Sequence, residues 1–218
     1  MLDIGGVLER GLHGREPALG FAAWLARWDE RRGAARGSSE ARFVAAQRDL
    51  VARGKDGRIG KCSEAEWHAA LALHLALEEG ELTAFVDGFW DAYLGELNVE
   101  LLAYLRALRT GFRTALLSNS FVGAREREHA RHAFGDAVDL IVYSHEEGVA
   151  KPDRAIYETT CKRLGVAPDE AVLLDDNESY VAGAVAAGMH AVRFVDNARA
   201  IGALEDLFAV GCANREVP

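Results

Sequence analysis

The sequence predicts an α/β fold in which a Rossmann-like open parallel sheet carries an inserted α-helical bundle. From about residue 99 onward, short apolar runs alternate with segments whose apolar residues recur at helical spacing. Strands of a parallel sheet are apolar throughout because helices cover both faces. Between about residues 14 and 97 the chain has almost no β-branched runs and several amphipathic segments, which indicates helices. We therefore expect a core domain of residues 1–13 and 98–218 and a helical cap domain of residues 14–97.

The core region should alternate between helices and strands. A helix over 99–109 leads into the strand RTALLS, and DLIVYS, AVLLDD and AVRFV supply three more strands. Helices over 153–164 and 179–187 connect the later strands. Pro152 suits a first helical turn and Gly165 a helix end.

The opening letters MLDI should form one further strand of this sheet. Only Met1 and Leu2 precede Asp3, whereas strands commonly run to about five residues. We expect either a chain that starts further upstream or a shortened middle strand.

The cap region should contain amphipathic helices whose apolar faces pack together. Three such faces are Phe21, Trp24, Leu25 and Trp28; Phe43, Val44, Gln47, Leu50 and Val51; and Leu82, Phe85, Val86, Phe89 and Tyr93. Ser63 and Glu66 form a capping box before a further helix that contains Trp67. The stretches GAARGSSE and RGKDGRIGK are the expected loops, and we interpret the cap tryptophans as packing residues.

Composition narrows the function classes. The 218 residues carry a formal net charge of −9, which argues against nucleic acid as a partner because such proteins present concentrated basic surfaces. Cys62, Cys161 and Cys212 are widely spaced and without nearby ligand histidines, so we expect reduced structural thiols. No apolar run approaches the roughly 18 residues of a membrane span. We expect a cytoplasmic monomer or homodimer with no membrane partner.

Polar side chains follow the strand ends, where ligands gather in open α/β folds. Asp3 precedes two glycines, Ser118 ends RTALLS, Lys151 stands in GVAKPD, and Asp175 and Asp176 end the most apolar strand. Each has an ordinary alternative: a strand end before a glycine loop, a turn, a solvated surface charge and a helix N-cap, respectively. Their common position at one sheet edge favours a site that combines a carboxylate, a hydroxyl, a cation and an acid pair able to bind a metal.

These segments resemble the haloacid dehalogenase superfamily, in its phosphatase-like branch with a helical cap inserted after the first motif. SHEEGVAKPDRAIYE and LLDDNESYVAGAVAAGMHAV are similar to the third and fourth family motifs, LLSNS to the second, and LDIGGVL to a variant of the first. The resemblance covers nearly the whole chain and implies the fold just described, with an active site gated by the helical cap.

The resemblance implies a catalytic role for three residues. Asp3 would attack phosphorus and form an aspartyl-phosphate that water then hydrolyses. Ser118 would hydrogen-bond the phosphoryl group, and Lys151 would offset its charge. Asn119 and Gly6 would contact the substrate.

The resemblance also implies a magnesium site. Asp3, the backbone carbonyl of Gly5 and Asp176 would bind Mg²⁺, with Asp175 assisting directly or through water. Hard oxygen ligands favour this ion. A metal and a lysine lower the negative potential that otherwise keeps a carboxylate from a phosphate.

One position departs from the family pattern. Phosphatases of the family generally have a second aspartate two residues after the nucleophile, as a general acid and base, and here that position is Gly5. General acid–base groups typically contribute about 10²–10⁴-fold in rate, so hydrolysis of esters with poor leaving groups should be weakened most. Glu9, His13 or a cap residue could substitute.

Three functions remain open at this stage. The leading hypothesis is a Mg²⁺-dependent phosphatase acting on a small phosphorylated metabolite. The alternative is a catalytically degenerate relative that binds a ligand or a protein. A 2-haloacid dehalogenase is less favoured, because such enzymes typically lack the pair formed by Asp175 and Asp176.

Overall fold

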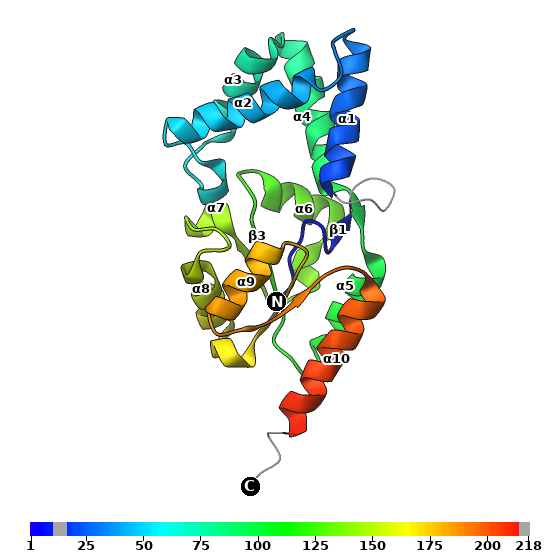
Figure 1. The fold of residues 1–218 in the computed structure, drawn as a ribbon, viewed down its shortest axis with the longest axis vertical. Helices are drawn as coiled ribbons and strands as arrows, with labels where there is room; N and C mark the ends of the chain where they lie inside the picture. The colour runs from blue at the N-terminus through cyan, green and yellow to red at the C-terminus, as the bar shows by residue number, and fades with distance from the viewer. Residues whose placement is uncertain (11–16, 214–218) are drawn as a thin grey trace.

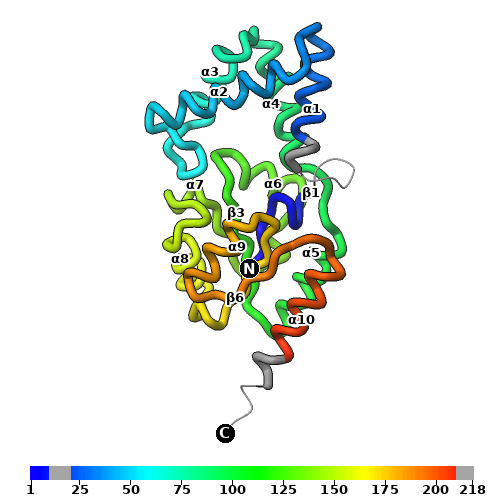
Figure 2. The backbone as a smooth tube through the Cα atoms, in the orientation of Figure 1, coloured from blue at the N-terminus to red at the C-terminus, as the bar shows by residue number. Residues whose placement is uncertain are grey.

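The computed structural model describes residues 1–10 and 17–213, and His13 lies outside them. Figure 1 shows two parts stacked along the long axis, a group of helices above and a sheet flanked by helices below. The tube in Figure 2 shows the N-terminus deep in the lower part, where Met1–Asp3 enters the sheet. The predicted α/β class is confirmed.

The sheet is parallel and has a short central segment. Its strands are β3 (Ala115–Ser118), β4 (Leu140–Tyr143), β5 (Val172–Asp175) and β6 (His190–Arg193). β3 pairs with β4 and β5 with β6 in parallel register. Leu2 bridges both halves through parallel contacts with Leu116 and Leu174, giving the order β4, β3, Met1–Asp3, β5, β6. The four predicted apolar strands are thus confirmed. The segment Met1–Asp3, which lies in the middle of the sheet, is short in this structure.

Helices flank the sheet in the core part. These are α5 (Val99–Leu108), α6 (Ala124–His132), α7 (Ser144–Glu147), α8 (Arg154–Leu164), α9 (Glu178–Ala186) and α10 (Asn197–Ala213). The predicted helices over 99–109, 153–164 and 179–187 correspond to α5, α8 and α9. The side chain of Asp153 caps α8 by accepting a hydrogen bond from the backbone N–H of Ala155.

The upper part consists of α1 (Pro17–Arg31), α2 (Ser38–Ala52), the 3₁₀ turn η1 (Gly57–Ile59), α3 (Glu64–Leu75) and α4 (Glu79–Leu94). The capping box of Ser63 and Glu66 is confirmed. The loop predicted for GAARGSSE is too long, since α2 already begins at Ser38. The reason is the buried Asp29 carboxylate, which accepts the backbone N–H groups of Gly37 and Ser39 and so stabilises the start of α2.

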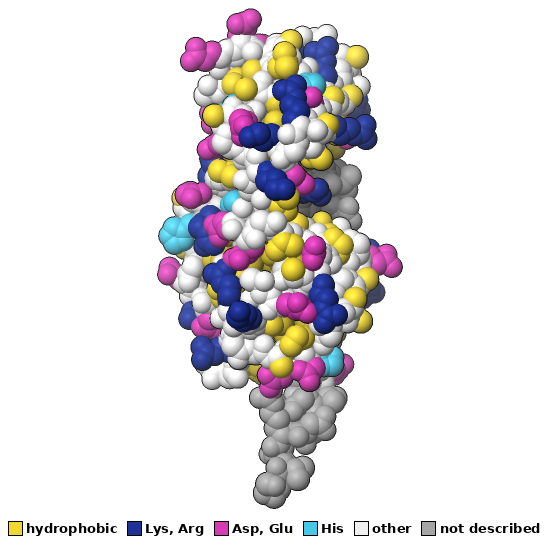
Figure 3. Space-filling view, turned by 90° about the vertical axis from the view of Figure 1, so that its left-hand side faces the viewer, with side chains coloured by type: hydrophobic (Ala, Val, Ile, Leu, Met, Phe, Trp, Pro, Cys, Tyr) yellow, Lys and Arg dark blue, Asp and Glu magenta, His cyan; other side chains and the backbone are white. Residues whose placement is uncertain are grey.

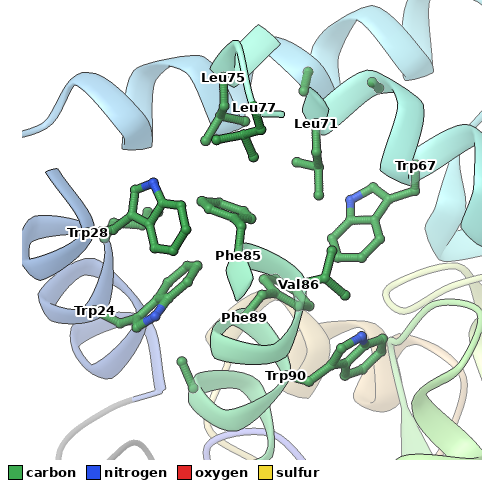
Figure 4. Packing of buried hydrophobic residues seen from close by; sticks show 14 of the residues in the cluster. Trp24, Trp28, Trp67, Leu71, Leu75, Leu77, Phe85, Val86, Phe89 and Trp90 are labelled. Carbon is green, nitrogen blue, oxygen red and sulfur yellow. The ribbon is translucent and has the colours of Figure 1, made fainter. Parts of the chain in front are cut away.

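Aromatic side chains hold the four upper helices together. Figure 4 shows Phe85 and Phe89 of α4 between Trp24 and Trp28 on one side and Trp67 and Trp90 on the other. All four tryptophans are buried, in agreement with their interpretation as packing residues. Apart from Ala124 and the partly buried Phe121, this cluster comes from residues 21–93, and the division into a core and a cap domain stays a prediction.

Two short strands join the parts. β1 (Glu9–Arg10) leaves the sheet and pairs antiparallel with β2 (Glu96–Leu97), through which the chain returns.

On the face drawn in Figure 3, acidic and basic side chains intermingle. Among the described residues, no helix combines the length and the apolar character needed to cross a membrane. Cys62 and Cys161 are buried free thiols.

Candidate active site

A crevice of about 490 Å³ opens where the parallel strands end at their carboxyl side. Among its lining residues are five of the predicted ones: Asp3, Gly5, Ser118, Asn119 and Asp176. They come from three separate segments of the chain, and the parallel sheet brings them together because its strands all end at the same edge.

Lys151 is buried between two carboxylates. Its Nζ lies 2.8 Å from Oδ1 of Asp3 and 2.6 Å from Oδ2 of Asp175, and its side chain has no exposed surface. Burial alone would lower the pKa of Lys151, but the two carboxylates outweigh it and hold this pKa above its ordinary value. The surface-charge alternative for Lys151 is therefore wrong.

Asn119 fixes the backbone that carries this lysine. Its side-chain amide donates to the carbonyl of Lys151 at 2.9 Å, and its amide oxygen accepts the N–H of Lys151 at 2.8 Å. Both polar atoms of the Asn119 side chain are thus engaged with protein backbone. The predicted contact with substrate remains a prediction for this residue, whose observed contacts position Lys151.

The candidate nucleophile is buried among charges of both signs. Burial raises the pKa of Asp3 to about 7, against the nearby ammonium of Lys151, which lowers it; the carboxylates of Asp175 and Asp176 raise it further. A divalent cation next to these carboxylates would favour the ionised, nucleophilic form of Asp3.

Three carboxylates converge at a spot suited to a cation. One ligand oxygen each from Asp3, Asp175 and Asp176 lies within 4.8 Å of the others. Hard oxygen donors of this kind suit Mg²⁺. Asp175 also accepts the backbone N–H of Asn177 at 2.9 Å, so both of its oxygens already have protein partners. This arrangement suits the supporting role predicted for Asp175.

Gly6 leaves the room that Asp176 needs. Gly6 adopts a φ of +81°, and a Cβ built there would lie 2.6 Å from Cγ of Asp176, closer than real contacts allow. A Cβ at Gly5 would meet nothing within 4 Å. Position 5 therefore has room for a Cβ, and position 6 does not.

Replacing Gly6 by Ala should therefore displace the Asp176 carboxylate. We expect Mg²⁺ affinity to fall about 10- to 100-fold and the free energy of unfolding to fall by about 1–3 kcal/mol, because Ala resists a positive φ. Calorimetric titration with Mg²⁺ and urea unfolding measure the two effects. Gly5→Ala is the matched control, and equal Mg²⁺ affinity in both variants would contradict this placement of Asp176.

Glu9 is one of the residues predicted to substitute for the missing aspartate. It is 1% exposed, and its Oε1 lies 3.5 Å from Nε2 of His132. Burial and then the neighbouring Glu128 carboxylate raise the pKa of Glu9 well above its ordinary value. Its backbone carbonyl accepts the N–H of Gly6 at 2.9 Å. Glu9 therefore lies next to the glycine turn, whereas His13 is outside the described residues.

Two tyrosines that the sequence analysis did not assign to the site border the crevice. The ring of Tyr180 on α9 lies with its centroid 5.0 Å from Nζ of Lys151. Tyr93 on α4 lines the crevice from the cap, and its hydroxyl lies 2.8 Å from Oγ of Ser120. The apolar face containing Tyr93 predicted packing, but did not indicate that one end of that face reaches the site.

The fold and the converging acids define a hydrolase of the haloacid dehalogenase type. The chain belongs to the haloacid dehalogenase-like hydrolase family, which it matches over residues 6–188. Asp3 stands just before the matched range, and the other predicted site residues lie within it, except Gly5.

Some curated relatives are named phosphatases, and another is named a dehalogenase. The ribulose-1,5-bisphosphate 5-phosphatase of Halopiger xanaduensis is 33% identical over 132 residues, 57% of this chain and 54% of the relative. The (S)-2-haloacid dehalogenase 1 of a Pseudomonas species is 34% identical over 131 residues, 56% of either chain. The chain thus spans about half the length of these curated relatives.

Solved structures share the fold over most of the chain. A family enzyme from Bacteroides thetaiotaomicron has a TM-score of 0.64 at 20% identity, covering 88% of this chain and 90% of that one. The same enzyme was solved in complex with magnesium and inorganic phosphate, with a TM-score of 0.61 at 18% identity and coverage of 88% and 91%. A 2-haloacid dehalogenase from Pseudomonas syringae has a TM-score of 0.61 at 19% identity, with coverage of 88% and 84%.

Proposed function

We propose that this protein is a Mg²⁺-dependent phosphatase that hydrolyses a small phosphorylated metabolite through an aspartyl-phosphate on Asp3. The observation that carries the proposal is the convergence of Asp3, Lys151 and Asp176 at one crevice. The phosphatase names of several relatives support it. The expected monomer or homodimer and the absence of nucleic-acid partners remain predictions.

In the proposed reaction a carboxylate oxygen of Asp3 attacks phosphorus while the bond from phosphorus to the alcohol oxygen breaks. Lys151 stays protonated between Asp3 and Asp175 and offsets the negative charge of the phosphoryl group. Ser118, at the end of β3, donates its hydroxyl to a phosphoryl oxygen. The alkoxide takes up a proton from solvent. Water then attacks phosphorus and loses a proton to solvent, and the Asp3 carboxylate leaves as inorganic phosphate forms.

Asp3, Asp176 and the carbonyl of Gly5 would hold Mg²⁺, with Asp175 supporting them. The ion would supply positive charge next to the phosphoryl oxygens, which a site with three acids otherwise repels. The room that Gly6 leaves for Asp176 and the oxygen-only donor set fit this ion.

The proposed site lacks a proton donor for the departing alcohol oxygen, because Gly5 has no side chain that could donate one. Gly5→Asp should raise the turnover of a simple alkyl phosphate by about 10²-fold and that of an activated aryl phosphate much less, since an aryl oxide leaves without a proton. A Cβ at position 5 meets nothing within 4 Å. Phosphate release from both esters measures the effect, and Gly5→Asn, which cannot exchange a proton, is the matched control.

The experiment that tests the function is hydrolysis of an activated aryl phosphate with and without Mg²⁺ by the unchanged protein and by Asp3→Asn. We expect a metal-dependent rate that Asp3→Asn abolishes. Equal, metal-independent rates in both proteins would overturn the proposal. No turnover together with binding of inorganic phosphate would instead favour the non-catalytic alternative.

A dehalogenase remains the second candidate because Gly5 also fits a reaction that needs no acid at this position. Halide release from a 2-haloacid without added metal would favour it. The paired acids Asp175 and Asp176 at the end of β5 favour the phosphatase.

A further inference from the structure

A second, larger cavity lies next to the crevice, on the side of the cap. It encloses about 750 Å³, which is within the range of pockets that bind drug-sized organic molecules. Gly5 and Tyr93 line both spaces. A molecule whose phosphate lies beside Asp3 can therefore extend past Gly5 into this cavity.

The cavity wall is mainly apolar. Phe21, Phe43, Trp67 and Phe89 contribute from all four cap helices, and Phe121 contributes from the segment after β3. These rings contact one another, as in the pairs of Phe21 with Phe43 and of Trp67 with Phe89. Such a wall attracts hydrocarbon or aromatic groups and offers few partners to hydroxyl groups.

Two of the charged side chains on the wall already have partners in the protein. Asp56 pairs with Arg58 at 2.8 Å, and Glu64 pairs with Arg127 at 2.7 Å. A polar sugar or nucleoside in the cavity would have to break such pairs or reach the few other polar groups of the wall, such as Gln47 and Arg48. Most of its hydroxyl groups would face the aromatic rings without hydrogen bonds, which is costly.

We propose that the substrate is a phosphoric monoester whose alcohol part is a bulky apolar group, and that this group occupies the cap cavity while the phosphate lies at Asp3. This inference rests on the proposed function and narrows its substrate class. It separates this chain from an enzyme for sugar or nucleotide phosphates.

The first test is a series of n-alkyl phosphates from ethyl to octyl, used below their micelle-forming concentrations. Each methylene that enters an apolar site should raise kcat/KM by about fourfold until the cavity is filled. Glucose 6-phosphate and ribose 5-phosphate should be no better than ethyl phosphate. A flat series, or sugar phosphates as the best substrates, would overturn the inference and leave the proposed phosphatase intact.

Two valines on α2 provide a matched pair of variants. Val51 lines the cavity and is 48% exposed, while Val44 lies on the same helix outside the lining and is 39% exposed. Val51→Trp should lower kcat/KM for octyl phosphate by about tenfold and that for ethyl phosphate much less, whereas Val44→Trp should change neither. Equal effects of the two substitutions would contradict the placement of the alkyl chain.

Binding without turnover separates this inference from the proposed function. Calorimetry with ethyl-, butyl- and octylphosphonate, which cannot be hydrolysed, should give affinities that rise with chain length and a negative heat-capacity change. That result in a protein with no hydrolytic activity would uphold the apolar site and refute the phosphatase. Affinities independent of chain length would refute the apolar site, whatever the activity.

Discussion

Asp3→Asn should reduce metal-dependent phosphate release by on the order of 10³-fold or more, because the amide cannot form the acyl phosphate. The substitution keeps the shape of the side chain and leaves Lys151 its second partner, Asp175, at 2.6 Å. We therefore expect a folded protein without turnover. Phosphate release from an aryl ester, at saturating Mg²⁺, measures the loss.

Mass spectrometry after an acid quench adds a direct readout of the intermediate. The unchanged protein should carry a phosphoryl group during turnover, and Asp3→Asn should carry none. Asp87→Asn, at an exposed position on α4, is the matched control and should retain full activity and phosphorylation. A phosphorylated Asp3→Asn protein would assign the nucleophile to another residue.

The strand ends were predictable because the pattern that defines a buried parallel strand also shows where it stops. LLSN and LLDD each pass from apolar to polar within one residue, and β3 and β5 end at Ser118 and Asp175. Parallel topology then places these ends at one edge without further information. Asp3, Ser118 and Asp176 line one crevice for this reason.

The contacts of Lys151 were not predictable from its surroundings in the sequence. A lysine before Pro152 has the same local pattern whether it is solvated or buried. Its burial depends on Asp3 and Asp175, which are far away in the chain, and on Asn119, which holds its backbone. Only the folded structure brings these groups together.

Helix α6 and the cap cavity were not predicted from the sequence, for two different reasons. Helix α6, with the sequence AREREHARH, has almost no apolar stripe and so gave no periodic signal. The apolar faces around Phe43 and Phe89 predicted packing correctly, but hydrophobic periodicity cannot distinguish a filled core from one that leaves a cavity.

Lys151 should also contribute to the free energy of unfolding of the protein. Its ammonium lies between two buried carboxylates, with Asp176 nearby as a third acid. A buried ion pair contributes little net stability as a unit, but removing one partner leaves the other buried and uncompensated. The loss of this lysine would leave Asp3 and Asp175 facing each other without their shared cation.

Lys151→Met should therefore abolish activity and lower the free energy of unfolding by about 3–5 kcal/mol at neutral pH. Urea unfolding measures this loss, and Lys162→Met, at an exposed position on α8, should remain within about 0.5 kcal/mol of the unchanged protein. Because Mg²⁺ would replace part of the missing positive charge, it should raise the unfolding midpoint more in Lys151→Met than in the unchanged protein. A loss below about 1 kcal/mol, or no extra stabilisation by Mg²⁺, would mean that the carboxylates do not share one site with the lysine.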